Sequence, residues 1–300
     1  MTNNPLIVAS EIGGLGNRFK AWASAMRMNP AARVHWPVND FMPASFAEIF
    51  DADCNIDEIP DLAEVYASWR LHLEPEDLAQ LPRGFTAVGS STHPLIRGLG
   101  KGWWKLTGRR NDHYRYMIFP KSHSKRMTRA DGKHIDLEYE RIPEYFRELY
   151  SGLFQRISVR PDILQRVDEW ALANLDDQVI GVQVRSWRDD ARRHRKYHLP
   201  ATKRLHALMR AAGDDARFLV VSDSDRVMTD LARDYGYDRV LQFSRRTDRD
   251  ASWVGPEGII EDLIDMLLLS RCNTIFASYL STFSEAAWWF GGACARVSVF

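Results

Sequence analysis

Residues 178–300 constrain the fold of this chain more than any other stretch, because strand-like and helix-like segments alternate there without interruption. Continuous apolar runs typical of buried strands occur at 178–185, 216–223, 238–243, 273–278 and 295–300. Helical apolar spacing separates them at 200–212, 224–236, 256–271 and 281–292. Five strands that alternate with four helices through short connections predict a doubly wound parallel sheet.

The N-terminal half begins with the same alternation. A short apolar strand is predicted at 5–10, a helix at 16–29 and a second strand at 32–37. We therefore expect an α/β protein with two Rossmann-like domains, 1–155 and 156–300, that face each other across a cleft. The C-terminal domain is the doubly wound sheet.

Composition excludes several classes of protein. Forty basic residues balance forty acidic ones in the 300-residue chain, which speaks against a nucleic-acid partner. The three cysteines, Cys54, Cys272 and Cys294, lack the spacing of a disulfide framework or a zinc site and favour a cytoplasmic location. No apolar run approaches the ~18 residues that a membrane span needs. A peripheral membrane contact stays open.

A glycine-rich turn, "GGLGNRF", joins the first predicted strand to the first helix. Gly13, Gly14 and Gly16 fit neither the Walker nor the dinucleotide-binding pattern, so they predict a close-approach turn at a helix start. Asn17 and Arg18 follow it and could reach across a cleft. The alternative is a tight strand-to-helix turn with no further role.

Cations gather at two places in this neutral chain. Arg185 ends a predicted strand, and Arg188 lies in the basic loop after it, which suits an anion such as a phosphate. A solvated basic loop is the alternative. The segment 97–133 holds eleven Lys or Arg residues interleaved with aromatic ones. Its composition suits binding of a glycan, including an anionic or lipid-linked one, or of single-stranded nucleic acid. The alternative is a loop that only covers the cleft or forms a subunit contact.

Two helix segments carry further candidates. Ser281, Thr282 and Ser284 stand where a strand ends and a helix begins, which is an anion site by geometry, or a plain helix cap. In the helix 256–271 the acidic residues share one stripe. Asp265 lies among apolar residues there, so its carboxylate needs a partner, such as the N1–H and amino group of a guanine.

The sequence lacks the motifs of zinc-dependent and serine-hydrolase catalysis. It has no HExxH zinc motif and no Gly-x-Ser-x-Gly elbow. Asp-x-Asp triplets occur, but forty acidic residues generate several by chance. We therefore expect no metal site and no cofactor.

Taken in order, "GGLGNRF", "IGVQVRS", "FLVVSD" and "LIDMLLLSRCNTIFASYLSTFSEAA" resemble the GDP-fucose-dependent fucosyltransferases with a GT-B fold. This superfamily includes bacterial nodulation and core α1,6-fucosyltransferases and protein O-fucosyltransferases. The resemblance covers 178–292 well and is thin in the first domain beyond the opening loop. It implies a C-terminal GDP-sugar-binding domain and an N-terminal domain on the acceptor side.

The resemblance also implies a role for each matching residue. Arg185 matches the arginine that grips the donor diphosphate, with Arg188 sharing this task because Ser186 replaces a second family arginine. Gln183 lies near the nucleotide, Asp223 near the ribose or phosphates, and Asp265 reads guanine. Ser281, Thr282 and Ser284 match the phosphate-binding turn. Asn17 and Arg18 match the first-domain loop that closes over the donor.

The implied reaction is an inverting, metal-independent transfer of fucose from GDP-fucose to a hydroxyl of a glycan or glycolipid. The glutamate that serves the α1,6 enzymes as base is missing here. Glu11 and Asp190 are equal candidates to replace it, and His194 is a third. Three alternatives stay open: another GDP-sugar as donor, a non-catalytic protein that binds a nucleotide or glycan, and a basic RNA-binding protein.

Overall fold

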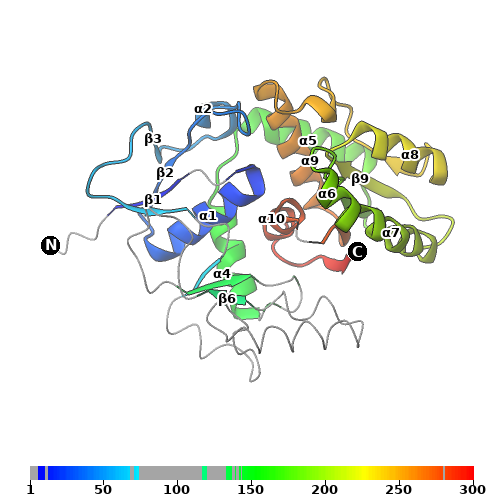
Figure 1. Ribbon diagram of the computed structural model, residues 1–300, viewed down its shortest axis with the longest axis horizontal. Coiled ribbons are helices and arrows are strands. Elements are labelled where there is room, and N and C mark those ends of the chain that lie inside the picture. The colour runs from blue at the N-terminus through cyan, green and yellow to red at the C-terminus, as the bar shows by residue number, and fades with distance from the viewer. Residues whose placement is uncertain are drawn as a thin grey trace. The chain divides into compact units, whose positions relative to one another are not determined.

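The computed structural model describes most of the chain, namely residues 6–10, 13–67, 71–73, 117–119, 133–136, 139, 142, 144–279 and 281–300. The chain divides into two compact units (Figure 1). The first consists of Met1–Pro37 and Asp53–Phe154, and the second of Val38–Ala52 and Gln155–Phe300. Glu11 and most of the cationic, aromatic segment 97–133 lie outside the described residues.

The first unit contains a parallel sheet with the strand order β3-β2-β1-β4. Its strands are β1 (Ile7–Ala9), β2 (Arg33–His35), β3 (Asn55–Ile56) and β4 (Glu64–Tyr66). Helix α1 (Leu15–Met28) follows β1, as predicted, and its apolar face is buried. A separate antiparallel sheet with the order β5-β7-β6 consists of β5 (Leu71–Leu73), β6 (Met117–Phe119) and β7 (Lys133–Asp136). Helix α4 (Glu144–Gln155) follows it in the chain.

The glycine turn has a structural reason. Gly13 has a φ of +105°, a backbone conformation that favours glycine, and Gly14 is the N-cap of α1. Arg18 in the first turn of α1 is buried, and it donates hydrogen bonds to the carbonyl oxygens of Gly13 and Pro37 at 2.9 and 3.1 Å. Its guanidinium also lies over the Trp36 ring. Arg18 therefore holds the turn against the segment after β2, a role that the sequence did not reveal.

The second unit contains the predicted five-stranded parallel sheet, with the order β10-β9-β8-β11-β12. Its strands are β8 (Ile180–Val184), β9 (Phe218–Ser222), β10 (Val240–Leu241), β11 (Thr274–Ala277) and β12 (Arg296–Val299). Its longer helices are α5 (Pro161–Asn174), α7 (Leu199–Ala211), α8 (Asp225–Tyr235), α9 (Pro256–Leu269) and α10 (Thr282–Phe290). The predicted α/β fold class is confirmed, with a parallel sheet in each unit.

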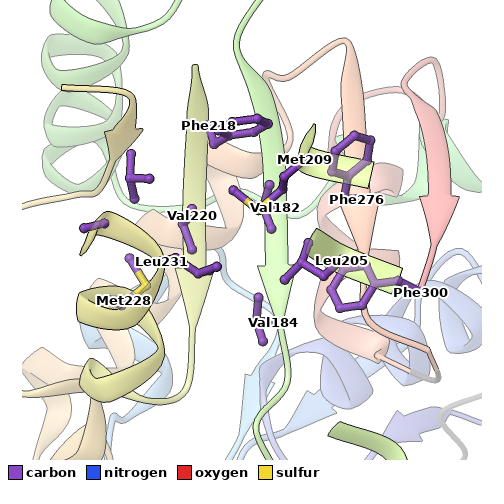
Figure 2. Close-up of a cluster of buried hydrophobic side chains, with 12 residues drawn as sticks. Val182, Val184, Leu205, Met209, Phe218, Val220, Met228, Leu231, Phe276 and Phe300 are labelled. Atoms are coloured by element: carbon purple, nitrogen blue, oxygen red, sulfur yellow. The ribbon is translucent and has the colours of Figure 1, made fainter. Parts of the chain in front are cut away.

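Alternation along the central strands gives the sheet two different faces. Val182 of β8 and Val220 of β9 pack on one face in a buried cluster with side chains of α7 and α8 (Figure 2). The residues that alternate with these valines along β8 and β9 point to the other face of the sheet, where α9 packs against both strands. There, a Cβ on Gly181 would lie 2.5 Å from Leu269 of α9, so glycine permits this close packing. The same face carries Gln183.

Shorter elements escaped the sequence analysis. They are α2 (Phe46–Ile49), α6 (Ala191–Arg193), the π-helix η3 (His194–His198) and the 3-10 helix η4 (Arg249–Ala251). Each is too short for an amphipathic pattern to show. Within the described ranges, no helix is long and apolar enough to cross a membrane.

Candidate functional site

A pocket lies at the carboxyl ends of β8 and β9, the edge at which doubly wound sheets bind ligands. Its empty volume, including the open mouth, is about 460 Å³. Five of the predicted site residues line it, namely Gln183, Arg185, Arg188, Asp223 and Asp265. The sequence analysis missed other lining residues, among them Ser222, Trp253, Asp262 and Phe283. All of the lining residues belong to the second unit.

Arg185 is fixed directly after β8. Its backbone N–H donates to Oγ of Ser278 at 2.8 Å, and that hydroxyl donates to the carbonyl of Gln183 at 3.0 Å. An Nη1 atom of its guanidinium lies 3.1 Å from Oδ2 of Asp223, and the side chain is 34% exposed. Arg185 is thus a positioned cation that solvent or a ligand can reach.

Asp223 and Arg188 hold the rim of the pocket. The other oxygen of Asp223 accepts a hydrogen bond from the backbone N–H of Ser186 at 2.7 Å. Arg188 donates to the carbonyl oxygens of Asp223 and Asp250 at 2.7 and 2.6 Å, and it forms an ion pair with the Asp250 carboxylate. Both side chains therefore connect the end of β9 to neighbouring loops, and Asp223 also orients Arg185.

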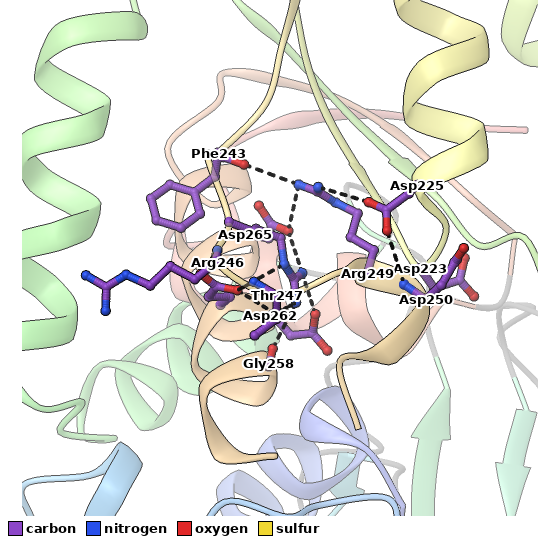
Figure 3. A network of polar contacts seen from close by, with 12 residues as sticks. Asp223, Asp225, Phe243, Arg246, Thr247, Arg249, Asp250, Gly258, Asp262 and Asp265 are labelled. Carbon is purple, nitrogen blue, oxygen red and sulfur yellow. Dashed lines mark hydrogen bonds and ion pairs between the residues drawn. The ribbon is translucent and has the colours of Figure 1, made fainter. Parts of the chain in front are cut away.

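A buried ionic cluster forms the inner wall (Figure 3). Arg245 is 2% exposed, and its Nη1 lies 2.7 Å from Asp262 and 3.2 Å from Asp265. Arg249 places Nη2 3.5 Å from the same Oδ2 atom of Asp265. The sequence indicated that Asp265 needs a partner, but it did not reveal these two arginines. The only sequence signal for Arg245 and Arg249 was that they belong to a basic segment just before the acidic helix.

Three buried polar atoms in the pocket have no hydrogen-bond partner among the described residues. They are Oδ1 of Asp265, Oε1 of Gln183 and Oγ of Ser222, whose residues are 1%, 3% and 6% exposed. Buried polar groups in native proteins are nearly always paired, because an unpaired one costs about 1–3 kcal/mol. Three of them in one pocket indicate a polar ligand that donates hydrogen bonds.

The charges of this wall depend on pH. Burial raises the pKa of Asp265 from its ordinary 3.8 to about 6, against the opposing effect of Arg249 and Arg245. Burial also raises the pKa of Asp262. For Glu261, burial alone would raise the pKa, but hydrogen bonds from Arg246 and Thr247 hold it below its ordinary value. Asp265 is therefore mainly ionised at neutral pH and becomes protonated in mild acid.

The start of α10 serves mainly as a helix cap. Oγ of Ser281 accepts from the backbone N–H of Ser284 at 3.4 Å, and the buried Ser284 hydroxyl donates to the carbonyl of Ser281 at 3.2 Å. The side chain that this turn contributes to the pocket is Phe283. Ser281, Thr282 and Ser284 are not among the lining residues, and the hydroxyls of Ser281 and Ser284 bond within the first turn of the helix. The expected role of the three residues at the donor phosphates stays a prediction.

Asp190 and His194, two of the candidate bases, follow Arg185 in the chain and make different hydrogen bonds. The Asp190 carboxylate caps α6, accepting from the backbone N–H groups of Arg192 and Arg193 at 3.1 and 2.9 Å. Nδ1 of His194 lies 2.7 Å from the carbonyl oxygen of Ser186. A carbonyl can only accept, so Nδ1 carries the hydrogen and Nε2 is left as an acceptor.

His198 packs against His194 one turn later with tilted rings, a pairing that the sequence analysis missed. The two ring centroids lie 4.7 Å apart. Burial lowers the pKa of His198, and the neighbouring His194 lowers it further. The lowered pKa favours the neutral imidazole of His198 at neutral pH.

Asn17 and Arg18 belong to the first unit, together with Gly13, Gly14 and Gly16. Their expected role in closing over a donor stays a prediction, as does the cleft between the domains. No cluster of three or more His, Cys, Asp or Glu in the described part of the chain could hold a metal ion.

Comparisons with known proteins agree on the fold. No family model and no curated protein matches the sequence. The crystal structure of selenomethionyl fucosyltransferase NodZ from Bradyrhizobium is similar, with a TM-score of 0.51 and 19% identity over 95% of this chain and 92% of that one. NodZ α-1,6-fucosyltransferase soaked with GDP-fucose gives 0.52 and 19% over 96% and 92%. The same enzyme co-crystallised with GDP gives 0.52 and 18% over 95% and 92%. At this identity the likeness shows a shared fold.

The ionic cluster predicts a large effect of one substitution. Arg245→Met removes the cation from three carboxylates of α9, and breaking such a buried group costs about 3–5 kcal/mol of unfolding free energy. Denaturant unfolding should show this loss. The loss should be larger at pH 8 than at pH 5. Without Arg245 the folded-state pKa values of Asp262 and Asp265 rise further above the unfolded values, and that of Glu261 rises from its lowered value. Stability from such groups is present at low pH and is lost as pH rises through the folded pKa.

Arg246→Met is the matched control for Arg245→Met. The neighbouring side chain is 77% exposed, and its nearest carboxylate, that of Glu257, lies 3.9 Å away. Its loss should change the unfolding free energy by less than about 0.5 kcal/mol at either pH. Equal effects of the two substitutions would show that the cluster does not stabilise the fold.

Proposed function

We propose that this protein is a glycosyltransferase whose donor is a GDP-sugar, GDP-fucose, bound in the pocket of the second unit. The observation that carries the proposal is the unpaired Oδ1 of Asp265, a buried carboxylate oxygen in that pocket. Guanine offers N1–H and an amino group on one edge, and both can donate to a carboxylate. Adenine has an acceptor at N1 and lacks that amino group, so the same carboxylate disfavours it.

The rest of the pocket suits the rest of a nucleoside diphosphate. Trp253 and Phe283 supply apolar surface for the faces of a base. Arg185 provides a fixed guanidinium for the phosphates, and the first turn of α10 borders the pocket through Phe283. These groups support departure of GDP without a metal ion.

The choice of fucose depends on the shared fold. The NodZ structures with the same fold were soaked with GDP-fucose or co-crystallised with GDP. A pocket that suits a guanine nucleotide, in a chain of the same fold, supports the same donor here. A different GDP-sugar is the nearest alternative, because the residues that face the sugar are not defined by the pocket.

The proposed reaction inverts the anomeric carbon. An acceptor hydroxyl attacks that carbon opposite the diphosphate, the bond to the phosphate oxygen breaks, and GDP leaves with the electron pair. A base takes the hydroxyl proton. We assign this role to His194, because its Nε2 is an acceptor while the Asp190 carboxylate is engaged in capping α6. Glu11 stays an untested alternative.

Calorimetry with GDP, ADP and UDP tests the donor. GDP should bind at least ten times more tightly than ADP or UDP, because one edge of guanine can satisfy Asp265 with two donors. Arg185→Ala should weaken GDP binding by roughly 2–4 kcal/mol. Arg226→Ala, at an 88% exposed position of α8, is the matched control and should leave the affinity unchanged. Equal affinity for the three nucleotides would overturn the proposal.

The affinity for GDP-fucose should depend on the ionisation of Asp265. The nucleotide needs the carboxylate, so affinity should fall as pH decreases through about 6, approaching tenfold per pH unit below it. GDP-fucose is the probe because its diphosphate, unlike that of GDP, has no group that titrates near pH 6. Asp265→Asn should bind more weakly and lose this pH dependence. A wild-type affinity that is constant between pH 5 and pH 7 would exclude Asp265 as the guanine contact.

Release of fucose from GDP-fucose into water tests the base and the need for metal. The activity should persist in EDTA. His194→Asn keeps a side-chain N–H near the Ser186 carbonyl but removes the basic nitrogen, and it should lower the rate about 10²–10⁴-fold with unchanged donor affinity. Asp190→Asn is the comparison and should lower it only a few-fold. The reverse ranking would assign the base to Asp190.

A further inference from the structure

We infer that a row of aromatic rings beside the pocket, with the cations that lie over them, binds an anionic saccharide. The ring row consists of Trp187, Tyr197 and Tyr279. That this saccharide is the acceptor depends on the proposed function, whereas the binding site itself does not. The acceptor class that follows is a sugar bearing a carboxylate, sulfate or phosphate.

The three rings come from separate segments and lie side by side. Trp187 follows β8, Tyr197 belongs to the π-helix η3, and Tyr279 follows β11. Adjacent ring centroids are 6.3 and 6.4 Å apart, with tilts of 42° and 41°. All three side chains are half-buried, so each retains exposed surface. The C–H faces of sugars pack well on such surfaces.

Cations lie over two of these rings. The guanidinium carbons of Arg185 and Arg193 are 5.0 and 4.9 Å from the centroid of Trp187. Nζ of Lys196 is 4.8 Å from the centroid of Tyr197. Cation–π contacts of this kind fix long basic side chains, so they are ordered before a ligand arrives.

The positive charge here exceeds what nearby carboxylates neutralise. Segment 185–198 has six Lys or Arg residues against Asp189 and Asp190, and Asp223 and Asp250 from outside the segment pair with Arg185 and Arg188. Within the described residues, Arg192, Arg195 and Lys196 have no carboxylate within ion-pair distance, whereas Arg193 pairs with Asp190 at 3.3 Å. A chain with no net charge thus presents a local cationic surface, and an anionic ligand complements it.

The ring row adjoins the proposed chemistry. Arg185 lies over Trp187 and also lines the nucleotide pocket. His194 and Tyr197 belong to the same π-helix, an element that is frequent at functional sites. Trp187 has a φ of +54°, a strained conformation for a bulky residue, and such strain concentrates at functional sites. A saccharide on these rings would lie next to the proposed base.

Single-stranded nucleic acid is the competing ligand, because it also combines bases for stacking with phosphates. The structure favours a saccharide for two reasons. The rings adjoin a pocket that suits a nucleotide-sugar, and the chain as a whole has no excess of positive charge.

Binding of matched saccharides to the GDP-saturated protein tests the inference. The probes are tetragalacturonate, a chondroitin sulfate tetrasaccharide and mannose 6-phosphate, each beside its neutral counterpart: the methyl ester, the desulfated methyl ester and mannose. At least one anionic probe should bind ten or more times tighter than its neutral partner. Tyr197→Ala should weaken binding of that probe about tenfold or more, and Lys196→Gln should reduce the preference for the anionic form.

Lys203→Gln on α7 removes the same charge from an exposed position outside the ring row, and it should leave the preference unchanged. Absent or equal binding of the charged and neutral probes would overturn the inference, as would tighter binding of an eight-residue oligothymidylate. GDP affinity, measured separately on each variant, distinguishes the two proposals. A protein that binds GDP but shows no anionic preference retains its proposed donor site and loses only this acceptor site.

Discussion

The pocket depends on one buried interaction, the contact of Arg245 with the carboxylates of α9. Helix α9 is otherwise mainly apolar and packs against β8 and β9, so the carboxylates of its acidic stripe need a cation beside them. Arg245 supplies that cation and also donates to the carbonyl of Gly258 at 3.0 Å, which fixes the first turn of the helix. The position of Asp265 relative to the strands follows from this contact. Without it, the buried carboxylates of Glu261 and Asp265 would lie beside that of Asp262 with too little positive charge to stabilise them.

Close packing on the same face explains why polar atoms end in the pocket without partners. Gly258 lies so near Ser252 that an added Cβ would come within 2.2 Å of its carbonyl oxygen, and Gly181 permits a similar approach on the strand side. Helix, strand and loop are therefore held at distances that side chains cannot adjust. Gln183 on β8 and Asp265 on α9 both point into the remaining space, and neither can reach a partner by shifting the backbone. Rigid surroundings of this kind preserve an unsatisfied group until a ligand pairs it.

The sequence predicted the fold of the second unit well because its elements are long or strongly apolar. The predicted strand at 216–223 and helix at 256–271 each agree with β9 and α9 to within two residues at both ends. The apolar pattern also predicted the strand that Arg185 ends, and this prediction located one side of the pocket. The partners of Asp265 could not be predicted, because Arg245 and Arg249 lie in an irregular segment whose contacts depend on tertiary packing. The contact between the rings of His194 and His198 depends similarly on a π-helix, which has no sequence pattern of its own.

The distribution of charge in the pocket gives it a direction. At the buried end, Asp265 presents a carboxylate on a side chain that is 1% exposed, whereas Arg185 at the rim is 34% exposed. A nucleoside diphosphate has the complementary polarity when its base offers hydrogen-bond donors, as guanine does, and its phosphates carry the negative charge. Reversed binding would bring phosphates against buried carboxylates, an unfavourable arrangement in a region of low dielectric constant. In the proposed function, this difference in charge would orient the nucleotide, with its base toward Asp265 and its diphosphate toward Arg185.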